Sequence, residues 1–89
     1  MIESELTIIN KLGLHARAAS KFVSCASRFA SKIQLAKDGQ WIDGKSIMSV
    51  MMLAAGKGST LMLRAEGKDE KAASEAIHAL VNDYFGEGG

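Results

Sequence analysis

Two hydrophobic patterns alternate along this chain, and their order strongly limits the folds it can adopt. Apolar residues recur at every second position in residues 31–37 and 59–66, which is typical of half-buried strands. The β-branched run at residues 6–9 predicts another strand. Asp38–Gly39 predicts a hairpin turn that returns the chain along a short strand at residues 40–43.

Helical spacing of apolar residues marks the segments between these strands. Helices are expected from residue 16 to about residue 30, from residue 47 to about residue 55, and from residue 70 to about residue 84. The order strand-helix-strand-strand-helix-strand-helix predicts an α+β fold, with the helices packed on one face of an antiparallel sheet. A chain of 89 residues is expected to form a single domain, residues 1–89, and its glycine-rich end at residues 86–89 should fray.

Composition argues against several classes of protein. No apolar run approaches the roughly 18 residues of a membrane-spanning helix, and the acidic start lacks the pattern of a signal peptide. We therefore expect a cytoplasmic protein without membrane insertion. A formal net charge of +1 argues against nucleic acid as a partner. The single cysteine, Cys25, is expected to pack within a helix, and no His or Cys cluster has metal-ligand spacing, so we expect no metal or cofactor.

The main candidate for chemistry lies in residues 10–19, N-K-L-G-L-H-A-R-A-A, where His15 precedes the first predicted helix. A helix N-terminus binds anions because its first N–H groups are unpaired and its dipole is positive there. A neutral imidazole at this place could hold a phosphoryl group, whose oxygens would find donors in the backbone of Ala16 and in Arg17. A lone histidine near a helix start also fits a loop or capping role, and it is the surrounding donors that favour the phosphoryl site. His78, on the polar face of the last helix, is expected to be ordinary surface.

The second predicted helix has almost no polar face. Ser46 is a suitable N-cap for it. Only about half of the positions in a three-turn helix can reach a core, so some of Ile47, Met48, Met51 and Met52 should be exposed to solvent. An exposed Met-rich patch suits adaptable contacts with several partners, but small proteins also leave apolar surface uncovered without a function. The pattern alone favours neither explanation.

Residues 39–46 satisfy G-x-x-x-x-G-K-[ST], the phosphate-binding loop pattern of nucleotide hydrolases. That loop should follow a buried parallel strand, whereas these residues hold a predicted hairpin turn and a strand that carries Trp41. No later apolar strand ends in an aspartate that could bind magnesium. We therefore interpret the match as a coincidence.

Two separated motifs carry a family resemblance. N-K-L-G-L-H-A-R at residues 10–17 and G-K-S-I-M-S-V-M-M-L-A-A-G-K-G-S at residues 44–59 resemble HPr, the family of histidine phosphocarrier proteins of the bacterial phosphoenolpyruvate-dependent phosphotransferase system. The resemblance implies an open-faced β-sandwich, with four antiparallel strands and three helices on one face. It implies a carrier and not an enzyme: His15 accepts a phosphoryl group on Nδ1 from enzyme I and passes it to enzyme IIA, with Arg17 as charge partner.

The family's second site falls on Ser46, which the resemblance implies is a regulatory phosphoserine made by an HPr kinase/phosphorylase. The family's partners dock on the first and second helices. The docking surface implied here consists of Lys21, Lys45, Ile47, Met48 and Met51. A phosphate on Ser46 adds about two negative charges beside this surface and should weaken docking. We expect the carrier to act as a monomer.

One position departs from the family pattern. HPr proteins commonly have proline directly after the arginine, where this chain has Ala18. Alanine is also tolerable in a first helical turn, so the histidine chemistry is left intact. Two alternatives stay open: a nitrogen-related HPr paralogue with regulatory output, and a non-catalytic RNA- or protein-binding domain. The strands lack interleaved aromatic residues for stacking on bases, with only Trp41 on one of them, which disfavours RNA.

Overall fold

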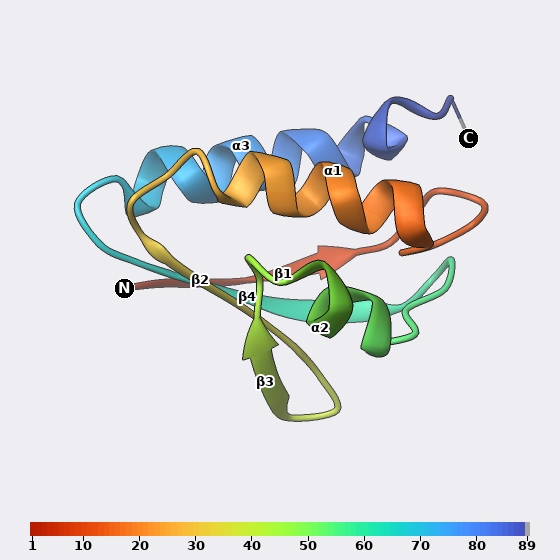
Figure 1. Cartoon of the computed structure of the whole chain (residues 1–89), viewed down its shortest axis with the longest axis horizontal. Coiled ribbons are helices and arrows are strands. Elements are labelled where there is room, and N and C mark those ends of the chain that lie inside the picture. Colours follow the sequence, from red (N-terminus) through yellow and green to blue (C-terminus); the bar gives the residue numbers. More distant parts are fainter. Residues whose placement is uncertain (89) are drawn as a thin grey trace.

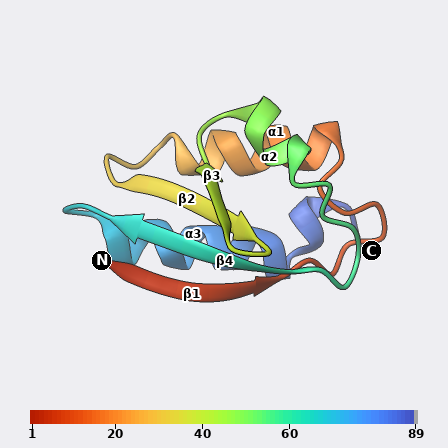
Figure 2. The same cartoon turned by 90° about the horizontal axis from the view of Figure 1, so that it is seen from below.

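The computed structural model describes residues 1–88, in which four antiparallel strands form a sheet of spatial order β1-β4-β2-β3. The strands are β1 (Ile2–Thr7), β2 (Lys32–Lys37), β3 (Gln40–Asp43) and β4 (Thr60–Glu66). The helices are α1 (Ala16–Ala26), α2 (Ile47–Met52) and α3 (Glu70–Asn82), followed by a short 3-10 helix, η1 (Tyr84–Gly86). The three α-helices lie on one face of the sheet (Figures 1 and 2). The predicted open-faced sandwich, with element order β-α-β-β-α-β-α, is confirmed.

The core lies between this sheet and the helices. The central strand β4 buries Leu61, Leu63 and Ala65 at alternate positions, as its period-two pattern predicts. The antiparallel register sets Leu61 beside Leu6 of β1 and Leu63 beside Leu35 of β2. From the helices the core receives Ala18, Ala19, Phe22, Cys25, Ala26, Val50, Ile77 and Val81. Burial of each large apolar side chain contributes about 1.5–3 kcal/mol, which makes this layer the main source of stability.

The first strand begins earlier than predicted. It occupies Ile2–Thr7 and not residues 6–9. Glu3 and Glu5 are exposed, and Glu3 accepts a hydrogen bond from Nε of Arg64 on the neighbouring strand at 2.8 Å. An edge strand with one solvated face can carry such charges, so its start lacks the β-branched run on which the prediction relied.

Two helices are shorter than predicted. The first, α1, ends at Ala26 and not near residue 30, and α2 ends at Met52 and not near residue 55. After α2 the chain turns through Ala54, whose φ of 52° lies in the left-handed region and cannot continue a right-handed helix.

The chain end differs most from the prediction. Tyr84, at the predicted end of the last helix, is 38% exposed, and its neighbour Phe85 is fully buried. Both residues have positive φ, 57° and 53°, so they cannot continue the right-handed helix α3. The prediction that residues 86–89 fray is wrong for Glu87, which forms hydrogen bonds, whereas Gly89 lies outside the described residues.

Three expectations from composition concern Cys25, membrane-spanning helices and metal-binding clusters. Cys25 is buried in α1 with a free thiol, in agreement with the predicted packing role. Within residues 1–88, none of the helices has both the length and the apolar character needed to cross a bilayer. Over the same residues, no three His, Cys, Asp or Glu side chains are grouped so that they could hold a metal ion.

Candidate functional site

His15 is the N-cap residue of α1, as predicted. Its backbone is extended, with φ −70° and ψ 176°, and its carbonyl accepts a helical hydrogen bond from the N–H of Ala19 at 2.8 Å. Its side chain makes no capping hydrogen bond and is 28% exposed. The imidazole is therefore available for contacts outside the helix.

Gly13 brings the loop that carries His15 against the segment that follows α2. Its φ is 67°, and a Cβ at this position would lie 2.5 Å from the backbone oxygen of Ala55. The N–H of Leu14 donates to that same oxygen at 2.8 Å. Only glycine fits both the positive φ and the close approach, so this residue joins the two motif regions of the sequence.

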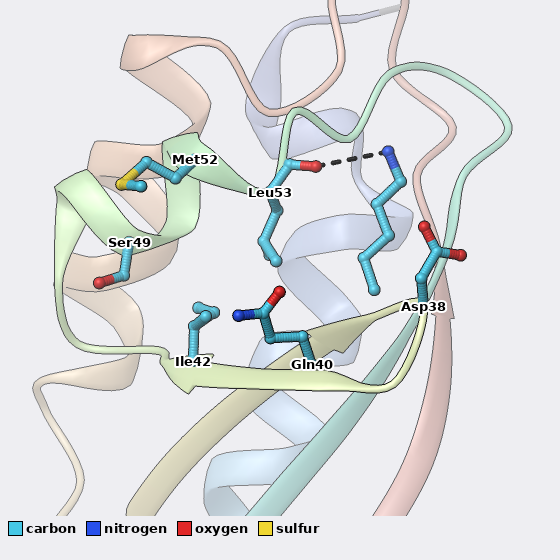
Figure 3. A pocket seen from close by; sticks show the side chains of 7 residues that line it. Asp38, Gln40, Ile42, Ser49, Met52 and Leu53 are labelled. Carbon is cyan, nitrogen blue, oxygen red and sulfur yellow. Dashed lines mark hydrogen bonds between the residues drawn. The ribbon is translucent and has the colours of Figure 1, made fainter.

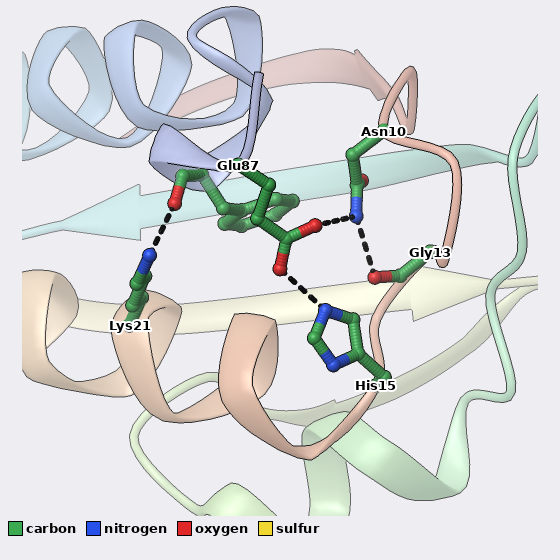
Figure 4. Close-up of polar contacts among 6 residues, drawn as sticks. Asn10, Gly13, His15, Lys21 and Glu87 are labelled. Atoms are coloured by element: carbon green, nitrogen blue, oxygen red, sulfur yellow. Dashed lines mark hydrogen bonds and ion pairs between the residues drawn. The ribbon is translucent and has the colours of Figure 1, made fainter. Parts of the chain in front are cut away.

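The end of the chain reaches the imidazole of His15 (Figure 4). Oε2 of Glu87 lies 2.5 Å from Nε2 of His15, and Oε1 of Glu87 accepts a hydrogen bond from Nδ2 of Asn10 at 3.1 Å. Asn10 is fully buried, and its Nδ2 also donates to the carbonyl of Gly13 at 2.8 Å. Desolvation raises the pKa of Glu87, but the hydrogen bonds from His15 and Asn10 and the nearby positive charges hold it below its ordinary value. Glu87 is therefore an ionised carboxylate at neutral pH.

A pocket of about 530 Å³ opens beside the imidazole. Its lining residues are Lys11, Leu12, His15, Arg17, Lys21, Gly86 and Glu87. Three of them are cations and one is an ionised carboxylate, so the pocket has a net positive charge. Arg17 is exposed, and within residues 1–88 its guanidinium forms neither a hydrogen bond nor an ion pair. A histidine, a helix start and an unengaged guanidinium around one pocket suit a phosphoryl group.

Ser46 is the N-cap of α2, as predicted. Its Oγ accepts a hydrogen bond from the N–H of Ser49 at 3.3 Å. The apolar side chains that follow reach solvent, with Ile47 42%, Met48 71%, Met51 40% and Met52 79% exposed. The expectation that part of this helix would be uncovered is confirmed for all four of them.

The other side of α2 faces the β2–β3 hairpin across a pocket of about 310 Å³ (Figure 3). Nζ of Lys37 donates to the carbonyls of Leu53 at 3.4 Å and Ala54 at 3.3 Å. A positive charge at this place stabilises the C-terminal end of α2. The nucleotide-loop pattern at residues 39–46 runs from the hairpin turn through β3, which pairs antiparallel to β2, to the cap of α2. This context differs from that of a phosphate-binding loop, in line with the interpretation of the match as a coincidence.

The two lysines predicted for docking have partners within the chain. Nζ of Lys21 donates to the carbonyl of Phe85 at 2.7 Å, and Nζ of Lys45 donates to the carbonyl of Phe29 at 2.7 Å. Each lysine therefore holds a backbone segment in place. That they also contact a partner protein stays a prediction.

Sequence reasoning missed Asn10 and Glu87 as members of this site. Asn10 lies inside the motif, directly after the strand predicted at residues 6–9, and Glu87 lies among glycines in a segment expected to fray. No short-range pattern links positions that are 77 residues apart. His78 is also less free than predicted, because its Nε2 shares a hydrogen bond with Oγ of Ser4 at 2.8 Å.

Known proteins resemble the whole chain. Residues 2–83 match the family described as "PTS HPr component phosphorylation site", a range that includes His15 and Ser46 and ends before Glu87. The phosphocarrier protein HPr of Cupriavidus necator is 51% identical over 88 residues, which cover 99% of each chain. The crystal structure of HPr-C-His from Thermoanaerobacter tengcongensis is 45% identical, with a TM-score of 0.94 over 98% of both chains. An HPr dimer from the same organism, also 45% identical, has a TM-score of 0.79 and covers 98% of this chain and 100% of that chain.

Proposed function

The chain belongs to the HPr family of phosphocarrier proteins, and from this premise we propose that His15 carries phosphoryl groups in a phosphotransferase relay. Enzyme I, charged by phosphoenolpyruvate, supplies the group, and enzyme IIA proteins receive it. The observation that supports this proposal is the position of His15 at the start of α1, beside an open pocket with net positive charge.

Phosphoryl transfer requires few catalytic groups on the carrier itself. Phosphoryl transfer depends mainly on positioning and on stabilisation of charge spread over three oxygens. The first N–H groups of α1, at Ala16 and Arg17, lack helical partners and face the end where a phosphoryl group on His15 would lie. The exposed guanidinium of Arg17 adds a mobile positive charge. The chain then acts as a phosphorylated intermediate, and its partner enzymes supply any metal ion.

Partner recognition is proposed at the docking surface of Lys21, Lys45, Ile47, Met48 and Met51. Its apolar members are exposed at the end of the molecule where α2 meets the His15 loop. Flexible methionine side chains can adapt to different partners, which suits a carrier that meets both a donor and several acceptors. Regulation is proposed at Ser46. A phosphate added there would stabilise the N-terminus of α2 but place negative charge beside the same surface.

Labelling with radioactive phosphoenolpyruvate and enzyme I tests the carrier proposal. We expect one acid-labile phosphate per chain in the wild type and none in His15→Ala. His78→Ala is the matched control, because it removes the other histidine and should keep full labelling. Labelling that persists in His15→Ala would refute the assignment.

ATP and an HPr kinase/phosphorylase test the regulatory site. We expect an acid-stable phosphate that disappears in Ser46→Ala and persists in Ser49→Ala, which removes a neighbouring hydroxyl of the same helix. The phosphorylated wild type should bind enzyme I more weakly than the unmodified protein. Unchanged binding would contradict the proposed effect of the added charge.

We also propose that the protein is a cytoplasmic monomer. The HPr dimer of Thermoanaerobacter tengcongensis makes the oligomeric state a point to measure. Light scattering should give a mass near 9.5 kDa that does not change with protein concentration. A stable mass near twice that value would contradict the proposal.

A further inference from the structure

We propose that Glu87 is a positioning residue that holds the proton of His15 on Nε2 and so leaves the lone pair of Nδ1 free for the phosphoryl group. The inference rests on the proposed function of His15. It assigns a role to the chain end.

The contact itself selects the tautomer. An ionised carboxylate can only accept hydrogen bonds, and the low pKa of Glu87 keeps it ionised at neutral pH. Nε2 of His15 lies 2.5 Å from Oε2 of this carboxylate, so Nε2 must carry the hydrogen between them. In the neutral ring the other nitrogen, Nδ1, then has the free lone pair. Within residues 1–88, no hydrogen bond occupies Nδ1.

Several anchors hold the carboxylate in this position. Phe85, two residues earlier, is fully buried, and its carbonyl accepts a hydrogen bond from Lys21 of α1 at 2.7 Å. Oε1 of Glu87 accepts from the buried side chain of Asn10 at 3.1 Å, which fixes the rotation of the carboxylate and points Oε2 at the ring. The side chain of Glu87 is only 13% exposed. The chain end is thus built to present one oxygen to His15.

With its proton on Nε2, the ring of His15 can accept and later release the phosphoryl group. The lone pair of Nδ1 forms the new N–P bond while the bond from phosphorus to the donor's leaving nitrogen breaks, and the leaving nitrogen keeps that electron pair. The ring keeps its Nε2 proton and becomes a phosphorylated imidazolium, whose positive charge the carboxylate of Glu87 stabilises. In the return step the ring leaves as neutral imidazole, a much better leaving group than imidazolide.

The surrounding charges allow a carboxylate and a phosphoryl group to share this site. Lys11, Arg17 and Lys21 line the same pocket as Glu87 and His15, so cations outnumber the single carboxylate there. The phosphoryl group would bind at Nδ1, while Glu87 contacts Nε2. Repulsion between the two anions is therefore offset by the three side chains around them.

Two substitutions of Glu87 separate this role from simple support. In Glu87→Gln, Asn10 should hold the amide oxygen, which turns the amide NH₂ toward His15 and favours a hydrogen on Nδ1. Phosphoramidate, which donates its phosphoryl group and releases ammonia without a protein partner, should then label His15 about tenfold more slowly than in the wild type. In Glu87→Ala water replaces the carboxylate, both tautomers are available, and the rate should fall only about threefold. A purely structural role would make alanine the more harmful change.

¹⁵N NMR of the unphosphorylated proteins gives an independent reading, taken at about pH 8.5, where histidine rings are neutral. We expect a pyrrole-type Nε2 and a pyridine-type Nδ1 in the wild type, and a shift toward the reverse in Glu87→Gln. Glu75→Gln, an exposed change of the same charge on α3, is the matched control and should match the wild type in rate and spectrum. An Nδ1–H tautomer in the wild type, or a Glu87→Gln protein no slower than Glu87→Ala, would overturn the inference. Failure of enzyme I and phosphoenolpyruvate to label the wild type would instead refute the proposed function, since the NMR result does not depend on it.

Discussion

The surroundings of His15 and the helix that follows Ser46 are held in place in different ways. The His15 site is tied by polar contacts that join it to Glu87, 72 residues further along the chain, and Glu87 to Asn10 across 77 residues. Ser46 is tied to Ser49, three residues away. The polar contacts of His15 therefore depend on closure of the whole fold, whereas the cap that begins α2 is local and the helix is held to the core by packing of Val50.

This difference matches the tasks proposed for the two regions. A nucleophile needs a defined proton and orientation, which long-range contacts to a packed fold can impose. An apolar surface that meets several partners needs exposed, adaptable side chains more than fixed geometry. Changes to the distant anchors should therefore affect His15 and spare α2, and changes to the cap of α2 should do the reverse.

The largest effect is expected from Phe85→Ala, which removes the anchor of the chain end. Loss of a fully buried phenylalanine should lower the free energy of unfolding by about 3–5 kcal/mol. Urea unfolding measures the loss, and hydrogen exchange should show faster exchange around η1 than in α2. Tyr84→Ala, at a 38% exposed neighbour, should cost less than about 1 kcal/mol. Equal losses in the two variants would contradict the burial that distinguishes them.

Gly13→Ala changes the contact between the His15 loop and the segment after α2. The new Cβ would lie 2.5 Å from a backbone oxygen at a φ of 67°, so strain and displacement together should cost about 3 kcal/mol. Thermal and urea unfolding give the value. Gly39→Ala is the matched control, since its φ is 83° but no atom beyond its two chain neighbours lies within 4 Å of the added Cβ, and it should cost about 1 kcal/mol. A Gly13→Ala protein as stable as this control would contradict the close approach.

Ser46→Ala should have a smaller and local effect. Loss of the cap to the N–H of Ser49 should cost about 1 kcal/mol. Hydrogen exchange should speed up in the first turn of α2, while the ring nitrogen signals of His15 stay unchanged. A change at His15 as large as the change in α2 would show that the two regions are coupled more tightly than their contacts indicate.

Acid should release the chain end without affecting α2. Because the folded pKa of Glu87 lies below its unfolded value of about 4.3, its contribution to stability is present above that pH. The contribution is lost as the pH falls through the folded pKa. NMR signals of Glu87 and of the His15 ring should therefore change below about pH 4, before those of α2. Glu87→Gln should remove this transition, and its persistence there would assign it to another group.

Much of the fold was predictable because strands and helices each require apolar residues at a characteristic spacing. The sequence shows a period of two in residues 31–37 and 59–66 and helical spacing in α1. These patterns identify the buried side chains without knowledge of the layer that packs against them. The position of His15 at a helix start and the exposure of Met48 and Met52 follow from the same local patterns. Such features depend on neighbours a few residues apart, so no tertiary information is needed.

The remainder of the site was decided by contacts between distant residues. Glu87 meets His15 because two successive residues adopt positive φ and one of them, Phe85, fills a place in the core. No local propensity favours that conformation, and a glutamate among glycines predicts a frayed end. The sequence by itself therefore determined the layers, the position of His15 at a helix start and the exposed helix. Only the tertiary structure decided which nitrogen of His15 carries its proton, because that depends on a carboxylate positioned by packing at the other end of the chain.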